Sequence, residues 1–222
     1  AGDGGGIGNA GTLVVNNSTI TGNSITGTIQ FGGGIFGGRI FDGSTLYYGG
    51  TITVNNSALT NNSSICDGAA IAVNSDAVSM TINNSTISGN NAPAGTAGGF
   101  FVGTFGDSAA ELNLSNSIVA GNGDANCFAG FFGAGSVLLA SGGYNVASDA
   151  SCNLVAAGDQ PATDPLLDLL GDNGGPTRTQ ALLPGSPAID AAGIAACPAT
   201  DQRGVARPQG VACDVGAFEV QP

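Results

Sequence analysis

Carboxylate groups are the first candidates for chemistry in this chain. Enzymes that cleave polysaccharides place two or three of them, or a strong base beside calcium, on one face. The 222 residues include 16 acidic residues, four arginines and no histidine. The acidic residues of the first 122 positions occupy no common column: Asp3, Asp42, Asp67, Asp76, Asp107 and Glu111. With Arg39 as the only base there, we expect no catalytic residues and no enzyme, and keep a polysaccharide lyase or hydrolase as an alternative.

Metal ligation is the second chemistry that the side chains suggest. Asp164, Asp168 and Asp172 have a loosely loop-like spacing, but they lack the ligand pattern of a known calcium loop. We therefore expect a solvated acidic turn and no cofactor, with structural calcium as the alternative. Without histidine or a Cys-x-x-Cys pair, the cysteines do not predict a zinc site.

Disulfide formation is the better interpretation of the five cysteines. Cys127 with Cys152, and Cys197 with Cys213, would each close a short loop outside the regular part of the fold. Cys66 is left over, and we expect a buried thiol there, with an intermolecular link as the alternative.

These residues must be positioned by a repeated element, because four stretches of the chain share one template. Aligned positions of successive stretches differ by 39, 28 and 32 residues. The template has an Asn column, a Ser column directly after it and a second Asn column six residues after the first: Asn17, Asn56, Asn84 and Asn116; Ser18, Ser57, Ser85 and Ser117; Asn23, Asn62, Asn90 and Asn122. Such spacing predicts stacked units that bury their apolar faces against one another.

The apolar residues of each repeat alternate with polar ones, which is the pattern of a β-strand. Residues 12–16 and 51–55 show it best, with Leu13 and Val15 sharing one face. We therefore predict an all-β chain that folds as a parallel β-helix with three corners per coil. The Asn columns then predict amide ladders between coils, and asparagine also tolerates the left-handed backbone of a corner. The Ser column is expected to form local hydrogen bonds.

Three parts of one continuous body are predicted. Residues 1–122 form the coils, residues 123–170 form the last irregular coil or coils with a disulfide-bounded loop, and residues 171–222 form a C-terminal cap. The connection at 36–50 is longer than its counterparts, and extra length in a solenoid often carries binding residues. Its candidate ligand residues are Arg39, Phe41, Tyr47 and Tyr48. A β-hairpin packed on the coil is an equally good interpretation.

Aromatic side chains gather in two neighbouring stretches. Phe128, Phe131 and Phe132 follow the last repeat, and Phe100, Phe101 and Phe105 lie before it. We expect an aromatic stack in the core, with a ligand platform as the alternative.

The C-terminal residues carry arginines beside carboxylates. We predict that they form a polar network that ties down a cap over the open end of the coils: Asp190, Asp201, Arg203, Arg207 and Asp214.

Several motifs resemble those of the bacterial choice-of-anchor Q domain family. They are DNGGPT at 172–177, LLPGSPAID at 182–190, DQRG at 201–204, DVGAFE at 214–219 and GYNVASD at 143–149. The repeats are also similar to those of polymorphic outer-membrane proteins. The resemblance implies a secreted or surface-exposed, right-handed parallel β-helix of bacterial origin, and it implies no activity.

Charge and composition narrow the partners. A net charge of −12 argues against binding to nucleic acid or to anionic membranes, and no apolar run is long enough to span a bilayer.

Residues 1–11 look like part of a coil without a cap, so we expect exposed strand edges there. We predict a non-catalytic extracellular or cell-surface structural protein that associates end to end, in one version as a filament. An adhesin that binds glycans through 36–50 is the alternative. Ice binding by flat rows of threonine is a further alternative, but Thr12, Thr51 and Thr81 give only one short, imperfect column.

Overall fold

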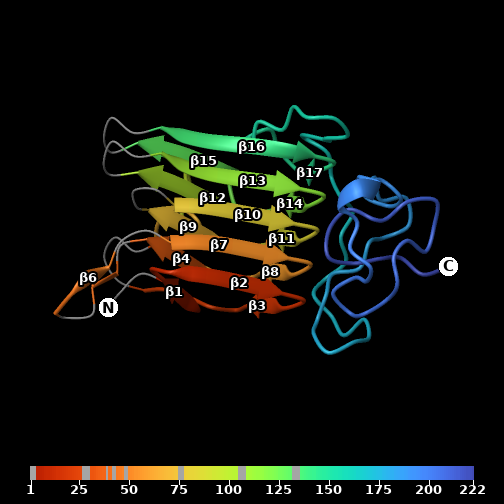
Figure 1. Ribbon diagram of the computed structural model, residues 1–222, viewed down its shortest axis with the longest axis horizontal. Coiled ribbons are helices and arrows are strands. Elements are labelled where there is room, and N and C mark those ends of the chain that lie inside the picture. The colour runs from red at the N-terminus through yellow and green to blue at the C-terminus, as the bar shows by residue number, and fades with distance from the viewer. Residues whose placement is uncertain are drawn as a thin grey trace.

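The chain folds as a parallel β-solenoid (Figure 1). The structure is a computed structural model that describes residues 4–26, 31–38, 40–41, 44–47, 50–74, 78–104, 109–131 and 136–222. Of residues 40, 41, 46, 47, 104 and 131 it describes only the backbone. Within these residues, three parallel sheets of five strands each form the walls of the solenoid. The predicted all-β parallel solenoid is thus confirmed.

Each coil contributes one strand to each sheet. Sheet A contains β1 (Ile7–Asn9), β4 (Ile35–Gly38), β9 (Ile71–Asn74), β12 (Ala97–Thr104) and β15 (Ala125–Phe131). Sheet B contains β2 (Thr12–Asn16), β7 (Gly50–Asn55), β10 (Val78–Asn83), β13 (Ala110–Ser115) and β16 (Val137–Gly143). Sheet C contains β3 (Thr19–Thr21), β8 (Ala58–Thr60), β11 (Thr86–Ser88), β14 (Ile118–Ala120) and β17 (Val146–Ala147).

The core lies inside these three walls and follows the predicted columns. On sheet B the strands are paired so that Leu13, Ile52, Met80, Leu112 and Leu139 form one row. On sheet C the inward row is Ile20, Leu59, Ile87, Val119 and Ala147. In the middle coils these side chains are buried, and each coil hides the apolar face of the next.

A fifth coil extends beyond the four repeats recognised in the sequence. Strands β15, β16 and β17 occupy 125–147, a range that we expected to be irregular. Residues 148–160 then lie over this last coil, and Cys152 and Leu154 complete its core.

The connection between β4 and β7 contains a short hairpin. β5 (Ile40–Phe41) and β6 (Leu46–Tyr47) pair antiparallel, with Ile40 opposite Tyr47. This agrees with the hairpin alternative for 36–50. In Figure 1 the hairpin projects from the side of the first coils.

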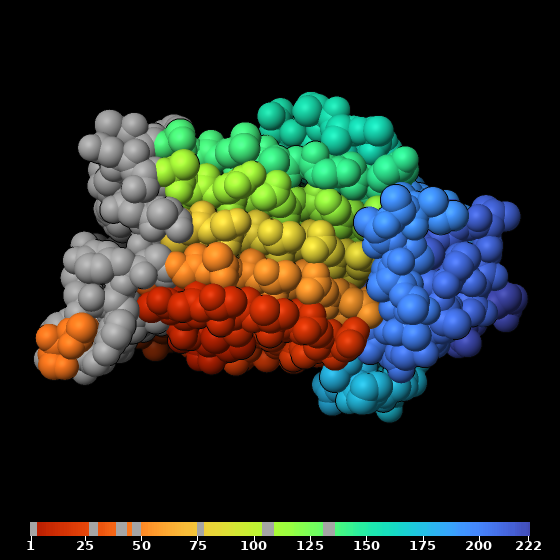
Figure 2. All heavy atoms as spheres, viewed as in Figure 1, coloured from red at the N-terminus to blue at the C-terminus, as the bar shows by residue number. Residues whose placement is uncertain are grey.

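The residues after 160 run along the flank of the solenoid, beside sheet C (Figures 1 and 2). They form a second apolar core against the outer face of sheet C, where Ile118 and Val146 meet Leu182, Val215 and Phe218. We call residues 164–220 the flank segment. Its one described helix is the short 3-10 turn η1 (Ile194–Ala196). We expected a cap over an open end, and these contacts lie along the side of the coils instead.

Candidate functional site

The corner between sheets B and C is the most regular feature of the molecule. Asn17, Asn56, Asn84 and Asn116 turn the chain there with φ angles of 48, 50, 49 and 48°. This left-handed backbone is accessible to asparagine at low cost. In the fifth coil Tyr144 takes the same position with φ 58°.

The serines after these corners connect the coils. The hydroxyl of Ser57 accepts the backbone N–H of Ser18 at 3.0 Å and donates to the carbonyl of Asn55 at 2.7 Å. Ser85 and Ser117 repeat this pattern one and two coils further on. The predicted local bonds are therefore joined by a bond to the neighbouring coil. In the fifth coil the amide oxygen of Asn145 replaces the hydroxyl and accepts the N–H of Ser117 at 3.0 Å.

The second Asn column forms a continuous amide ladder inside the solenoid. Asn23 donates to Asn62 at 3.0 Å, Asn62 to Asn90 at 2.9 Å, and Asn90 to Asn122 at 2.8 Å. Each accepting oxygen also receives the backbone N–H of the asparagine below it. Asn126, which sequence reasoning missed, continues the ladder by accepting from Asn122 at 2.9 Å. Neutral amides thus satisfy one another in a buried row.

The first Asn column behaves differently from the ladder that we predicted. Only Asn17 and Asn56 bond to each other within the column, at 2.7 Å. Asn56 and Asn84 also donate to the carbonyls of Thr200 and Ala196 in the flank segment, at 3.1 Å each. Asn116 both donates to and accepts from Gly193, at 3.2 and 2.8 Å. The corner amides therefore dock the flank segment onto successive coils.

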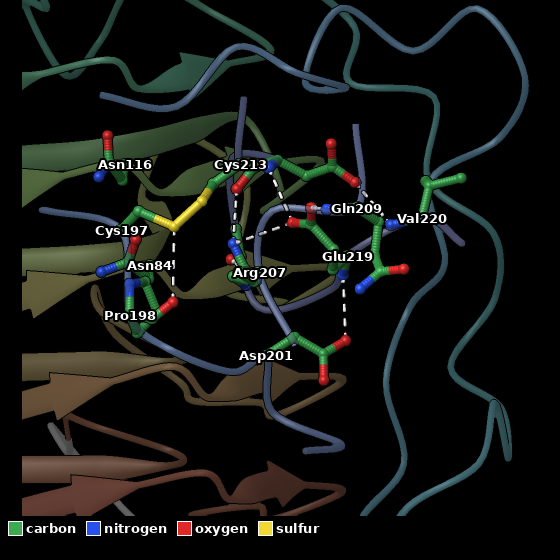
Figure 3. Close-up of polar contacts among 12 residues, drawn as sticks. Asn84, Asn116, Cys197, Pro198, Asp201, Arg207, Gln209, Cys213, Glu219 and Val220 are labelled. Atoms are coloured by element: carbon green, nitrogen blue, oxygen red, sulfur yellow. Dashed lines mark hydrogen bonds and ion pairs between the residues drawn. A yellow bond between two sulfur atoms is a disulfide. The ribbon is translucent and has the colours of Figure 1, made fainter. Parts of the chain in front are cut away.

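The predicted polar network lies inside the flank segment (Figure 3). The guanidinium of Arg207 donates to the carbonyls of Asp214 and Gly216 at 2.7 and 2.8 Å, and lies 3.6 Å from the carboxylate of Glu219. Glu219, another carboxylate of this arginine-rich stretch, is fully buried and accepts the N–H groups of Gln209 and Asp214. Burial lowers the pKa of Arg207, and the charge of Glu219 opposes this shift.

The remaining charged groups of this network also hold backbone atoms. The carboxylate of Asp201 pairs with Arg203 at 2.7 Å and accepts the N–H groups of Arg203, Val205 and Glu219. The guanidinium of Arg203 lies 3.6 Å from the centre of the Phe218 ring.

Asp214 links the middle of the flank segment to its C-terminal end. Its carboxylate accepts the N–H groups of Asp190 and Val220 at 2.8 and 2.6 Å, and Asp190 in turn accepts from Ala212 at 3.1 Å. Burial raises the pKa of Asp214 above its ordinary value. Buried carboxylates saturated by backbone N–H groups fix the shape of a chain and present little to a substrate.

Both predicted disulfides are present. Cys197–Cys213 closes a loop in the flank segment, and Figure 3 shows it beside Asn84 and Asn116. Cys127–Cys152 ties strand β15 to the loop over the last coil. Cys127 thus belongs to a regular strand, and we had expected a loop. The free thiol of Cys66 is only partly buried.

The predicted ligand residues of 36–50 fall largely outside the described residues. Arg39 and Tyr48 lie outside them, and Phe41 and Tyr47 are described only as backbone. The aromatic stack lies on the outer face of sheet A, where the Phe101 ring stacks on Phe31 at 5.0 Å and on Phe128 at 6.0 Å. Phe128 is 48% exposed. The stack that we expected in the core is therefore external, and among the described rings of the two stretches only Phe100 points into the solenoid. Phe105, Phe132 and the side chain of Phe131 lie outside the described part of the chain.

The proposed calcium residues lie apart in separate turns. Asp164, Asp168 and Asp172 each accept a nearby backbone N–H, from Leu166, Leu169 and Gly174. Among the described residues, no three acidic or cysteine side chains group together as metal ligands.

An open groove of about 520 Å³ separates the flank segment from the corners of the upper coils. Gly89, Gly121 and Ser148 form one side, and Asp164 and Gln180 form the other. Asp164 is the one titratable group among its lining residues, so the groove does not offer the paired carboxylates of a hydrolase.

Comparison with models of known families, with characterised proteins and with solved structures finds no match for this chain. The similarity to choice-of-anchor Q proteins and to polymorphic outer-membrane proteins thus rests on the motifs alone. No helix in the described part of the chain is long and apolar enough to cross a membrane. A β-solenoid with two disulfides fits a structural or surface protein in an oxidising extracellular environment.

Proposed function

We propose that this chain is a non-catalytic structural protein of the extracellular space or the bacterial cell surface. The observation that carries the proposal is the buried, uncharged ladder from Asn23 to Asn126, which joins all five coils into one stack. The two disulfides support an oxidising location. A stack held together in this way is suited to a structural role at a surface.

The first test asks whether the protein cleaves polysaccharides. The purified protein is incubated with acidic and neutral polysaccharides, and reducing ends and unsaturated uronates are measured over time. We expect no turnover, because the described carboxylates are dispersed or saturated by backbone N–H groups. Release of either product above a boiled control would contradict the proposal.

End-to-end contact is part of the proposal, and the first coil offers the surface for it. Within the described residues, β1, β2 and β3 have a strand partner on one side only, and Leu13 and Ile20 are only partly buried. The amide oxygen of Asn23 receives no N–H from any described residue, although the amide oxygen of Asn62 receives two, both from Asn23. Another coil of the same template would satisfy these groups. Residues 148–160 cover part of the last coil, where Val146 pairs with Gln160, so a pair joined at the first coil is favoured over an open filament.

Sedimentation at several concentrations and electron microscopy test this contact. We expect a concentration-dependent dimer in which the stack of coils is twice as high and the other two dimensions are unchanged. The variant Cys66→Ser should behave in the same way, which separates strand pairing from an intermolecular disulfide. A strictly monomeric particle would rule out the end-to-end contact. It would not contradict the proposal that the chain is a non-catalytic structural protein.

Glycan binding is the second candidate, supported by the exposed face of Phe128 stacked on Phe101. The parent chain and the variant Phe128→Ala would be compared on a glycan array. Glycan binding predicts signals for the parent chain that the variant does not give. A parent chain without signals would remove this candidate.

A further inference from the structure

The outer face of sheet B is a regular array of short side chains. Its strands are paired in register, so the outward residues form three rows across the coils. The first row is Thr12, Thr51, Ser79, Glu111 and Leu138; the second is Val14, Thr53, Thr81, Asn113 and Ala140; the third begins with Asn16, Asn55, Asn83 and Ser115. Thr81 therefore lies beside Thr53, and the single column of Thr12, Thr51 and Thr81 was wrong.

This face is uncovered, unlike that of sheet C. In Figures 1 and 2 the strands of sheet B face the reader, and no described segment lies over them. Thr12, Thr51 and Asn16 are exposed, and Val14 is 54% exposed. Glu111 is the one charged residue in the three rows, although the chain as a whole has a net charge of −12. Hydroxyl, amide and methyl groups thus make up nearly the whole face.

The side chains of the array also keep a regular spacing. Rows are separated by about 6.7 Å along the strands and neighbouring strands by about 4.8 Å. Threonine has a restricted χ1 angle, so its hydroxyl and methyl groups keep fixed positions. Asn55 bonds to Asn16 at 2.9 Å and Asn83 to Asn55 at 3.0 Å, which locks the third row. Side-chain ladders of this kind keep a parallel sheet from twisting.

We propose that this face binds the surface of ice. A regular array of hydroxyl, amide and methyl groups, with Glu111 as its one charged residue, can hold water molecules at repeating positions, as a crystal plane does. A polysaccharide sheet is the competing flat lattice, but sugar rings are held by aromatic side chains, and the three rows contain none. A charged protein partner fits poorly because only Glu111 could form an ion pair. This inference goes beyond the proposed structural role and does not depend on it.

The experiment measures inhibition of ice recrystallisation and thermal hysteresis, with the intact chain and two variants. Thr51→Lys/Thr53→Lys places long, charged side chains in the middle of the array. Thr21→Lys places one on sheet C, at an exposed position outside the array. Circular dichroism and the unfolding temperature confirm that each variant is folded. We expect inhibition by the parent chain and by Thr21→Lys, and its loss in the double variant.

Two further arms keep the proposal falsifiable. Thr53→Val and Thr81→Val retain the branched shape without the hydroxyl, so they cannot fail through misfolding alone, and they should weaken inhibition. Pull-down with crystalline cellulose and chitin tests the competing lattice. The proposal is overturned if the folded parent chain inhibits nothing, if Thr21→Lys loses as much as the double variant, or if the chain binds polysaccharide and not ice.

Discussion

The coils and the flank segment remove polar groups from water in opposite ways. In the coils, neutral amides such as Asn62 and Asn90 bond to copies of themselves at every step. In the flank segment, charged groups such as Arg207 and Glu219 each hold a different set of backbone atoms. The coils are therefore stabilised by many equivalent hydrogen bonds. The flank segment depends on a few hydrogen bonds, each of which occurs only once.

The two regions should therefore respond differently to the loss of one group. A missing ladder amide leaves one or two neighbours unsatisfied, at about 1–3 kcal/mol each. A missing partner of a buried ion pair leaves an uncompensated charge, which costs about 3–5 kcal/mol.

Arg207→Met should give the largest effect. It removes the donors to the Asp214 and Gly216 carbonyls and leaves Glu219 buried beside an apolar side chain. We expect a loss of about 3–5 kcal/mol, confined to the flank segment. Limited proteolysis should show new cleavage after residue 160 and protected coils.

Two variants control this experiment. Arg178→Met removes an exposed arginine of the same segment and should change little. Arg207→Met/Glu219→Gln should recover part of the loss, because the uncompensated charge is gone. Equal cleavage of coils and flank segment in Arg207→Met would mean that the two regions unfold as one unit.

Removal of each disulfide in turn compares the stability of the coils with that of the flank segment. Cys197→Ser/Cys213→Ser opens a loop with a sequence separation of 16, which costs about 3 kcal/mol in the loop-entropy model. Cys127→Ser/Cys152→Ser opens one with a separation of 25 and should cost a similar amount. Only the second pair should lower the unfolding temperature of the coils, because Cys127 and Cys152 lie in their core. Loss of coil stability in the first pair would contradict this separation.

The sequence was a good guide where the structure repeats. The apolar columns and the second Asn column could be predicted because every coil presents the same side chains to the next. The last coil was predicted as irregular because Tyr144 and Asn145 replace the Asn-Ser pair, although Asn145 accepts the same N–H as a serine would. The offset of 28 residues from Asn116 to Tyr144, followed by apolar Val146 and Ala147, was the signal available.

The position of the flank segment could not be predicted from the sequence. Its contacts join residues that are far apart, such as Gln202 and Thr19 at a separation of 183 residues. Corner asparagines suited to a ladder turned outward to Gly193 and its neighbours instead, because backbone carbonyls of the flank segment compete for the same amides. Composition predicted that arginines and carboxylates would pair, but not that Glu219 would lie at the centre.

Asn90→Ala tests the ladder by removing one of its middle steps. Asn90 accepts two N–H groups from Asn62 and donates to Asn122 and to the carbonyl of Leu59. We expect a loss of about 2–3 kcal/mol in chemical unfolding of the coils. Asn23→Ala, in the first coil, removes one donor and should cost less than about 1 kcal/mol. Similar losses in both variants would show that the ladder does not stabilise through its buried bonds.

The smallest expected effect is a pH dependence of the flank segment that the coils lack. Burial raises the pKa of Asp214 above its ordinary value of 3.8, so the folded chain favours the protonated carboxyl. The protonated carboxyl of Asp214 therefore contributes to the stability of the folded chain below pH 3.8. This contribution is lost as the pH rises through the raised pKa. One unit of pKa shift corresponds to about 1.4 kcal/mol, which keeps this effect below the others.

Asp214→Asn should remove that dependence. Asparagine can still accept the N–H of Asp190 but cannot accept that of Val220, and the free energy lost with that hydrogen bond does not depend on pH. The difference in unfolding free energy between parent and variant should therefore shrink as the pH rises from 4 towards 7. Proteolysis of the flank segment at a series of pH values measures this difference, with Asn90→Ala as the pH-independent control from the coils. A difference that grows with pH would show that the hydrogen bonds to Asp190 and Val220, which favour the charged carboxylate, outweigh burial at Asp214.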